Sequence, residues 1–386
     1  MKDISYIINH LGEDREKFLN SVTPPLFQTS NFAFRNVREL KKAIADEKNS
    51  HIYSRGNNPT IDILCKKIAA LEETEEALSF ASGMAAISSA ILSFVSAGDH
   101  IVSVRNNYSW THMLMTRFLP RFGIETTFVD GRDPDNFKKA VRKNTRILYL
   151  ESPNSLTFEI QDIGTIAAFA KSAGITTLID NSYSSPLTQS PAVMGTDIVL
   201  HSASKYLSGH SDVVAGMVCG SSVNISRMFN NEYMGLGGII SPFNAWLLLR
   251  GLRTLEARID RISATTAEVL KYLENHPFVS EILHPLSRRH PQYDLAVKQM
   301  LKPTGLFSIR LSTSDIRKTE KFVNALKVFL IGVSWGGHES LVFPALSFDA
   351  GRKRNAYSNN LIRFYIGLDD PQLLIRDLEQ AFALIA

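Results

Sequence analysis

Short runs of apolar residues, each bounded by polar or turn-forming residues, recur through the middle of the chain. Runs of this length and composition are typical of buried strands. Stretches with helical spacing, such as residues 162–173, separate several of them. Alternating strands and helices predict an α/β fold with a mostly parallel sheet covered on both faces. The predicted strands are His100–Val104, Glu125–Val129, Arg146–Leu150, Thr176–Ile179, Asp197–Leu200 and Ala215–Cys219.

The hydrophobic pattern changes twice along the chain, and these changes predict its domains. The first part is mixed and turn-rich, and Pro59 then suits the first turn of a helix. Residues 243–273 are strongly helical. Beyond them, Leu306–Leu311 and Leu361–Ile366 alternate like strands before an amphipathic final helix. We therefore predict an N-terminal arm over 1–58, an α/β domain over 59–248 and a smaller C-terminal α+β domain over 249–386.

Composition and charge narrow the class of protein. The 386 residues are 44% hydrophobic and 21% charged, which is typical of a soluble globular protein. The 42 basic and 38 acidic residues contain no block of like charge, so we expect no nucleic-acid partner. We expect no membrane partner either, because no 18-residue apolar run occurs and the N-terminus lacks a secretory pattern. Only Cys65 and Cys219 occur, without metal-ligand spacing, so we expect a cytoplasmic location and no metal.

Two predicted strands end in polar clusters that can do chemistry. Asp180 follows one strand, and Ser202, Ser204 and Lys205 follow the next. A parallel sheet binds ligands at the carboxyl ends of its strands, so we expect these groups to meet. Pyridoxal phosphate (PLP) needs such groups, because a lysine forms an imine with its aldehyde and a carboxylate holds a proton on its ring nitrogen. A surface lysine and a turn-forming aspartate are the alternative interpretations.

Other residues fit the same ligand. Ser82, Gly83 and Met84 follow an apolar run and predict a helix N-terminus, which favours a phosphate. An ordinary helix cap is the alternative there. Tyr108 follows a predicted strand and could stack on a ring. Arg363 alternates with apolar neighbours and could bind a substrate carboxylate through two parallel hydrogen bonds, unless it simply faces solvent.

The lysine segment also allows an enzyme of a different class. Ser202-Ala203-Ser204-Lys205 fits the S-x-x-K pattern of serine acyl-enzymes. That class also needs S-D-N and K-T-G elements. The chain has Ser211-Asp212-Val213 and no K-T-G, so this hypothesis is the more remote one.

Seven segments form a recognisable set that runs nearly from end to end. They are Y-S-R-G-N-N-P-T from Tyr53, S-G-M-A-A from Ser82, E-S-P from Glu151, I-D-N from Ile179, H-S-A-S-K-Y-L-S-G-H-S-D from His201, L-R-G-L-R-T-L from Leu249 and S-W-G-G-H-E-S from Ser334. This set resembles the trans-sulfuration family of PLP enzymes, which includes cystathionine β-lyase, cystathionine γ-synthase, cystathionine γ-lyase and methionine γ-lyase. The resemblance implies an aspartate-aminotransferase-like fold (fold type I) and a small amino-acid substrate.

The resemblance also implies roles for single residues. Lys205 would be the imine-forming lysine that moves the α-proton, with Asp180 at the ring nitrogen and Tyr108 stacked on the ring. The implied phosphate ligands are Gly83, Met84, Ser202 and Ser204.

Further implied roles concern the substrate and a second subunit. Tyr53 and Arg55 match residues that reach the phosphate of a neighbouring subunit, which implies a homodimeric active site, usually within a homotetramer. Arg363, with the backbone near Ser334 and Trp335, would receive the substrate carboxylate. Lys205, Tyr108 and Tyr53 are thus the catalytic candidates.

Within the family, E-S-P-N-S-L-T-F-E-I-Q-D-I and S-W-G-G look closest to bacterial cystathionine β-lyases. This implies β-elimination of L-cystathionine to homocysteine, pyruvate and ammonia. Val333, a residue shared with methionine γ-lyases, keeps γ-elimination or γ-replacement as alternatives, and a catalytically silent member is a further one. Ser109-Trp110 departs from the family pattern, and the contact to the ring's 3-oxygen stays open between Asn154 and Ser155.

Overall fold

The computed structural model describes residues 3–349 and 359–386, and contacts divide the chain into two units. Unit 1 comprises Met1–Ser152, Gln161–Ser208 and Asp212–Thr254, and unit 2 comprises Pro153–Ile160, Gly209–Ser211 and Leu255–Ala386. The units change after Thr254, whereas the predicted boundary after residue 248 falls inside helix α10 (Pro242–Leu252). Residues 1–58 group with unit 1 in this chain, and their contact with a neighbouring subunit stays a prediction.

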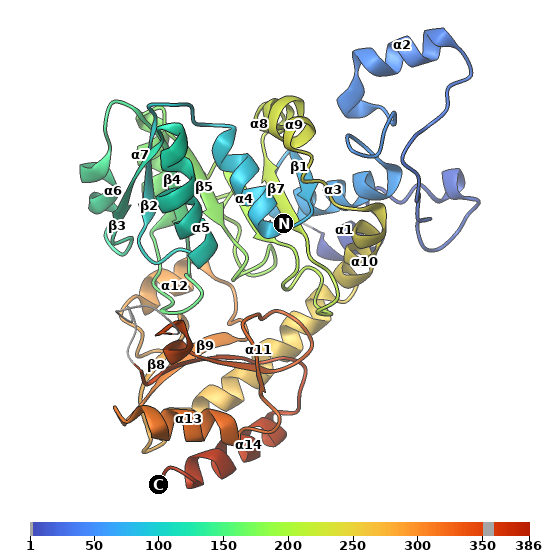
Figure 1. The fold of residues 1–386 in the computed structure, drawn as a ribbon. Coiled ribbons are helices and arrows are strands. Elements are labelled where there is room, and N and C mark those ends of the chain that lie inside the picture. The colour runs from blue at the N-terminus through green and yellow to red at the C-terminus, as the bar shows by residue number, and fades with distance from the viewer. Residues whose placement is uncertain (1–2, 350–358) are drawn as a thin grey trace. The chain divides into compact units, whose positions relative to one another are not determined.

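Unit 1 contains a seven-stranded sheet in the order β1-β7-β6-β5-β4-β2-β3 (Figure 1). The pairs from β6 through β3 are parallel, which confirms the predicted mostly parallel sheet. Strand β7 is antiparallel to both β6 and β1, because residues 203–215 connect β6 to β7 without the crossover helix that a parallel pair needs. The strands are β1 (Glu76–Phe80), β2 (His100–Val104), β3 (Glu125–Val129), β4 (Thr145–Glu151), β5 (Thr176–Asp180), β6 (Ile198–Ser202) and β7 (Gly216–Gly220).

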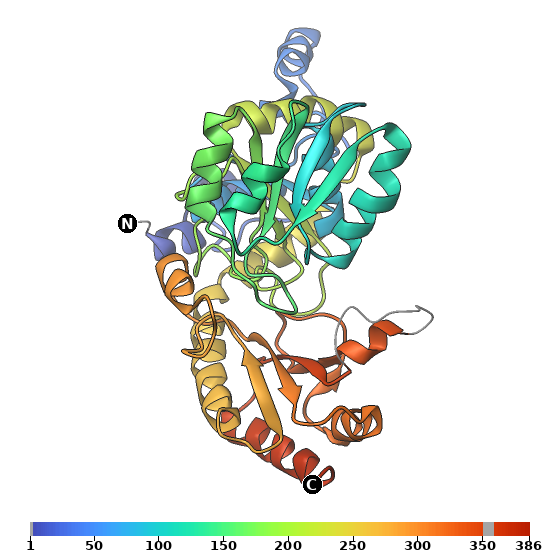
Figure 2. The ribbon, with the colours of Figure 1, turned by 90° about the vertical axis from the view of Figure 1, so that its left-hand side faces the viewer.

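Helices lie on both sides of this sheet (Figure 2). Asn58 caps α3 by accepting the N–H of Thr60 at 3.0 Å, and Pro59 occupies the first turn as predicted. The helices of unit 1 are α1 (Ile4–Asn9), α2 (Val37–Ala45), α3 (Pro59–Glu72), α4 (Gly83–Leu92), α5 (Ser109–Met113), α6 (Pro134–Ala140), α7 (Ile163–Ser172), α8 (Ser222–Met228), α9 (Met234–Leu236) and α10; short turns of other helix types are η1 (Arg15–Phe18), η2 (Glu47–Asn49), η3 (Leu114–Phe118), η4 (Leu119–Phe122) and η5 (Phe229–Tyr233).

The core of unit 1 forms between the sheet and these helices. All five residues of β2 and of β7 are buried, which is why both read as continuous rather than alternating runs. The cluster includes Phe80, Ile91, Ile147, Tyr149, Leu178, Leu200 and Val218. The strand ends, where polar residues follow the apolar runs, are therefore held by a buried framework.

Unit 2 is the predicted α+β domain, with a five-stranded sheet in the order β10-β11-β12-β9-β8. The strongly helical stretch predicted over residues 243–273 forms two helices. Helix α10 ends at Leu252, and α11 of unit 2 begins at Leu255. Leu374, Leu378 and Ala381 of the final helix are fully buried, as their spacing predicts. The elements are β8 (Val279–Leu283), β9 (Leu306–Leu311), β10 (Leu330–Ile331), β11 (Leu341–Pro344), β12 (Leu361–Tyr365), α11 (Leu255–Leu273), α12 (Tyr293–Gln299), α13 (Ile316–Ala325), α14 (Pro371–Ala383) and η6 (Ala345–Asp349).

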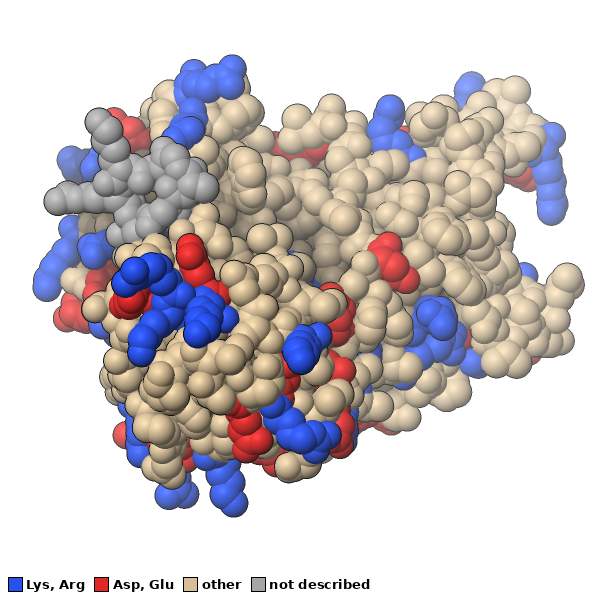
Figure 3. Space-filling model, turned by 60° about the horizontal axis from the view of Figure 1, so that its bottom comes forward, with Lys and Arg blue, Asp and Glu red and all other residues tan. Residues whose placement is uncertain are grey.

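The surface carries charges of both signs. On the face that Figure 3 shows, basic and acidic side chains of the described residues are intermingled, in keeping with the near balance of charge. Of the helices in the described part of the chain, none combines the length and apolar character that crossing a membrane requires.

Candidate active site

The carboxyl ends of β5 and β6 bring together the acid and the lysine that the sequence predicts. The two strands are parallel neighbours, and Asp180, the last residue of β5, is aligned with Leu200 of β6. Beyond β6 the chain turns, and the N–H of Lys205 donates to the carbonyl of Ser202 at 3.1 Å. Lys205 is half-buried and lies close enough that its charge lowers the pKa of Asp180.

The Asp180 carboxylate is buried at this edge, with only 7% of the residue exposed. Its Oδ1 accepts the N–H of Ser182 at 2.9 Å. Burial raises the pKa of Asp180, while the Ser182 hydrogen bond and the charges of His201 and Lys205 oppose the rise. Because a cationic N–H donor stabilises the ionised form of a buried carboxylate, Asp180 is suited to a protonated ring nitrogen.

The N-terminus of α4 lies beside the end of β6. Ser82 caps the helix, and its Oγ accepts the N–H of Ala85 at 3.0 Å. A methyl group built on Gly83 would lie 3.0–3.2 Å from Ser202, so the first turn of α4 and Ser202 are in close contact. The predicted phosphate ligands Gly83, Met84 and Ser202 thus share one region, where helix N–H groups favour an anion.

Ser204, another predicted phosphate ligand, has its hydroxyl engaged by the backbone at the start of β7. Its Oγ accepts the N–H of Ala215 at 3.0 Å and donates to the carbonyl of Ala215 at 3.3 Å. The hydroxyl therefore holds the lysine loop against the β7 entry. Its contact with a phosphate stays a prediction.

The donor set at this edge fits PLP. Asp180 would hold the ring nitrogen, Lys205 the aldehyde carbon, and Gly83, Met84 and Ser202 the phosphate. An anionic phosphate, a cationic ring and an aldehyde each need one of these groups. Across residues 3–349 and 359–386, no group of three or more His, Cys, Asp or Glu side chains is arranged to hold a metal ion.

Tyr108 directly precedes α5 and is 42% exposed. Its backbone N–H donates to Glu151 Oε2 at 2.6 Å. Glu151 is the last residue of β4 and is aligned with Asp180 of β5, so its carboxylate ties the start of α5 to the same sheet edge. The E-S-P motif contains Glu151, but its spacing carries no sign of this contact.

Tyr53 and Arg55 are both exposed on this chain. The guanidinium of Arg55 lies over the Tyr53 ring, 5.7 Å from its centroid. The structure thus brings these two residues to each other, and their reach toward a neighbouring subunit stays a prediction.

Arg363 of unit 2 is buried on β12 rather than facing solvent, with 9% exposed. Its guanidinium donates to the carbonyls of Ser155 at 3.0 Å and Val333 at 2.8 Å, and lies 5.2 Å from the centroid of the Phe343 ring. These contacts fix the plane of the guanidinium, as two parallel bonds to a carboxylate require.

Ser334 and Trp335 follow Val333 in the segment between β10 and β11. Ser334 is exposed, whereas Trp335 is buried. In the nearby loop of unit 2, Asn154 Oδ1 accepts the N–H groups of Leu156, Thr157 and Phe158, so this oxygen serves its own loop. Neither Asn154 nor Ser155 is thereby assigned to the cofactor ring.

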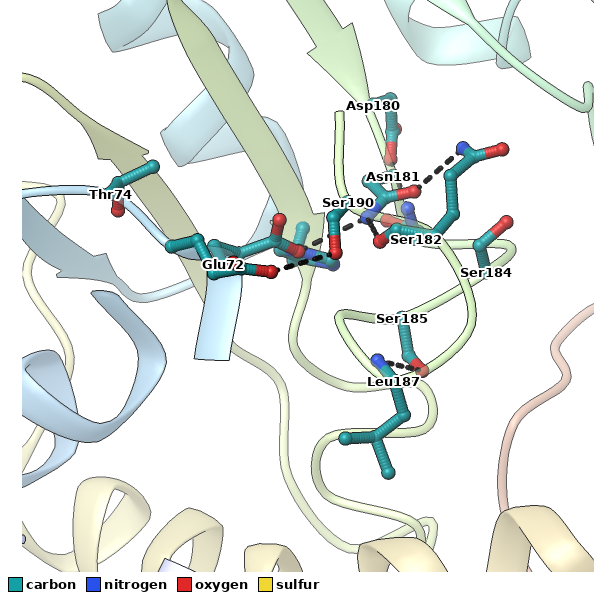
Figure 4. A network of polar contacts seen from close by, with 12 residues as sticks. Glu72, Thr74, Asp180, Asn181, Ser182, Ser184, Ser185, Leu187 and Ser190 are labelled. Atoms are coloured by element: carbon teal, nitrogen blue, oxygen red, sulfur yellow. Dashed lines mark hydrogen bonds and ion pairs between the residues drawn. The ribbon is translucent and has the colours of Figure 1, made fainter. Parts of the chain in front are cut away.

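Glu72, His201 and Asn181 form a buried network that spacing does not predict (Figure 4). Asn181 and His201 belong to the I-D-N and H-S-A-S-K segments, which mark their positions but not their partner. Nothing in the sequence near Glu72 indicates the contact, because Glu72 lies at the end of α3, far along the chain from both.

Comparisons with known proteins agree with this geometry. The family model described as "Cys/Met metabolism PLP-dependent enzyme" matches residues 6–383. The chain is 36% identical to the L-methionine gamma-lyase of Treponema denticola over 384 residues, covering 96% of this chain and 94% of that protein. It is 35% identical to the cystathionine gamma-lyase of Bacillus subtilis, covering 96% and 97%, and 34% identical to the cystathionine beta-lyase of Lactococcus lactis, covering 99% of each.

The fold has a close match among solved structures. The crystal structure of metB from Corynebacterium glutamicum superposes with a TM-score of 0.93 and 31% identity, covering 100% of this chain and 99% of that one. Sequence and fold thus agree over nearly the whole chain. The protein therefore belongs to the Cys/Met metabolism PLP-dependent enzyme family, and its cofactor is pyridoxal phosphate.

Proposed function

We propose that the protein is a carbon–sulfur lyase that cleaves L-cystathionine by β-elimination to homocysteine, pyruvate and ammonia. The observation that carries the PLP-dependent part of this proposal is the shared edge of β5, β6 and α4, which holds a buried acid, a half-buried lysine and a helix N-terminus. The segments E-S-P-N-S-L-T-F-E-I-Q-D-I and S-W-G-G, which resemble those of cystathionine β-lyases, favour β-elimination. Named lyases among the relatives support the class of reaction. Family membership also favours this chemistry over a serine acyl-enzyme.

Bound PLP supplies an electron sink for the bonds broken at the substrate. Lys205 would hold the cofactor aldehyde through its amine, and the substrate amine would take its place. The freed Lys205 Nζ then removes the proton from the α-carbon. The C–S bond would break, the sulfur would leave with the bonding electron pair and take up the proton held by Lys205, and one water would release pyruvate and ammonia.

Other residues orient the reactants. Asp180 would keep the ring nitrogen protonated, and Tyr108 would stack on the ring. Arg363 is our candidate for the substrate carboxylate, because its planar group is already oriented by the Ser155 and Val333 carbonyls.

Elimination at the γ-carbon is the second candidate. Val333 is 79% exposed in unit 2, and its carbonyl accepts from Arg363, so its side chain lies near the proposed carboxylate site. The residue is the one that methionine γ-lyases share. The names of the relatives from Treponema denticola and Bacillus subtilis favour the same reaction.

The keto acid formed from L-cystathionine distinguishes the two candidates. β-Elimination yields pyruvate, and γ-elimination yields 2-oxobutyrate. We expect pyruvate, identified by chromatography against both standards. Production of 2-oxobutyrate alone would replace the first candidate with the second.

The role of Lys205 can be tested separately. Lys205→Ala should abolish turnover and the visible absorbance that borohydride bleaches, while Lys171→Ala, which removes an exposed lysine on α7, should keep both. A turnover-competent Lys205→Ala enzyme would contradict the assignment. Labelling of Ser202 by a penicillin would instead favour the serine acyl-enzyme.

We also propose that Tyr53 and Arg55 complete the active site of a second subunit within a homodimer or homotetramer. Their exposure on this chain supports the idea. Mixing Tyr53→Phe with Lys205→Ala should restore part of the activity, because one site in a mixed dimer is then intact. No recovery in verified mixed dimers would count against it.

A further inference from the structure

A buried acid and a buried imidazole face each other behind the sheet edge that carries the cofactor residues. Glu72, at the end of α3, and His201, on β6, have side chains that are 0% and 1% exposed. His201 Nε2 and Glu72 Oε1 are in direct hydrogen-bond contact. The same Oε1 accepts Nδ2 of Asn181 at 3.1 Å. One oxygen of Glu72 thus contacts both His201 on β6 and Asn181 at the end of β5.

The network extends across three strand ends. Asn181 Nδ2 also donates to the Gln189 carbonyl at 3.1 Å, and Gln189 Nε2 donates to Asn181 Oδ1 at 3.0 Å. Gln189 Nε2 then donates to the carbonyl of Ser152, just past β4, at 2.8 Å. The end of α3 is thereby tied to the ends of β4, β5 and β6. Figure 4 shows the contact between Glu72 and Asn181.

The network residues are the chain neighbours of predicted cofactor ligands. Asn181 follows Asp180, and His201 precedes Ser202. Successive side chains of a strand point to opposite faces, so His201 is directed away from the face that Ser202 presents. His201 therefore contacts Glu72 on the face of β6 opposite to the one that Ser202 presents.

Fold stability is a poor explanation for this arrangement. Glu72 Oε2 is buried without a hydrogen-bond partner, and the same holds for Gln189 Oε1. Removing the Glu72 carboxylate from water costs more free energy than the two hydrogen bonds to its Oε1 return. A buried pair of this kind therefore adds little to the free energy of unfolding. The network does reach the site, because His201 lies near enough to Asp180 to be among the groups that oppose the rise in its pKa caused by burial.

We propose that Glu72, His201 and Asn181 are positioning residues that hold the ends of β5 and β6 in register and so aim Asp180 and Ser202 at the cofactor. The proposal rests on the PLP chemistry within the proposed function, and not on which carbon–sulfur bond is cleaved. It requires that changes to the network alter the binding and the spectrum of PLP more than they alter the stability of the apoprotein.

The test compares Glu72→Gln, His201→Gln and the double variant with wild type. Glu73→Gln is the matched control, since it removes the same charge one residue along, from an exposed side chain that accepts from Ser190 at 3.3 Å. Three quantities are measured: the dissociation constant of PLP from titration of apoprotein, the visible circular dichroism of the bound cofactor, and the melting temperature of the apoprotein.

We expect each single variant to raise the PLP dissociation constant about tenfold and to change the visible circular dichroism. The double variant should be no worse than the weaker-binding single variant, because the residues act as one unit. Glu73→Gln should match wild type in both measurements. The keto-acid assay on wild type is independent of these results. Failure of the proposed β-elimination and failure of the proposed positioning role can therefore be told apart.

Several results would overturn the proposal. One is a PLP dissociation constant and cofactor spectrum within error of Glu73→Gln, even if the melting temperature falls. Strict additivity in the double variant is another. Should Glu72→Gln not fold, His201→Gln carries the same comparison, and loss of folded protein in both would show a structural role instead.

Discussion

We predict that one methyl group added at Gly216 weakens cofactor binding while the protein still folds. It lies at the start of β7, paired with Phe80 of β1 and Ser202 of β6. A Cβ on Gly216 would lie 2.3 Å from the Ser82 carbonyl oxygen and 2.9 Å from the Ala86 Cβ. Both atoms belong to the first turn of α4 or its cap, so Gly216→Ala pushes directly on the predicted phosphate site.

The size of the effect follows from these distances. The 2.3 Å approach is about 1 Å short of ordinary contact, and the obstacle is backbone, which cannot rotate away. Overpacking of this kind costs about 1–3 kcal/mol of unfolding free energy. A displacement of about 1 Å in a positioned group can lower a rate by about a hundredfold. We therefore expect a folded, moderately destabilised Gly216→Ala protein with weakened PLP binding and turnover near 1% of wild type.

Denaturant unfolding and titration of the apoprotein with PLP measure the two effects on one preparation. Gly235→Ala is the control, because nothing lies within 4 Å of a Cβ at that position and its φ is not positive. The control should match wild type in PLP affinity. If Gly216→Ala also binds PLP like the control, then α4 does not hold the phosphate where we place it.

Three further predictions concern other parts of the chain. Glu13→Gln leaves the fully buried Lys67 ammonium without its carboxylate, 3.1 Å away, and should lower the unfolding free energy by about 3 kcal/mol. The exposed pair of Asp135 and Lys138 offers a control, since Asp135→Asn should unfold at the wild-type denaturant midpoint. Burial lowers the pKa of His284 to about 4, so the neutral form stabilises the fold fully above pH 6.5 and that stability is lost as the pH falls toward 4. The loss from this group is about 2 kcal/mol at pH 5, and His284→Gln should show a correspondingly shallower fall between pH 7 and 5; an equal fall would refute the assignment. Arg363→Lys loses the planar fork and should raise KM about tenfold or more with a smaller change in kcat, whereas an unchanged KM would remove it from the substrate site.

The sequence by itself determined the local elements and the chemistry of their ends. β2, β3 and β9 have the predicted bounds, because runs of apolar residues and flanking turn residues are properties of neighbouring positions. The placement of Asp180 and Lys205 at one sheet edge was also predictable, since neighbouring parallel strands have their carboxyl ends at the same edge.

Only the tertiary structure decided the contacts between distant segments. The antiparallel direction of β7, the closeness of Gly216 to the cap of α4, and the contact of Glu72 with His201 all join residues that no periodicity relates. Such contacts depend on how whole elements pack, and a single carboxylate at a helix end reads like any surface residue until its neighbours are known. The predicted residues of the site came from strand ends, whereas the network that holds them came from packing.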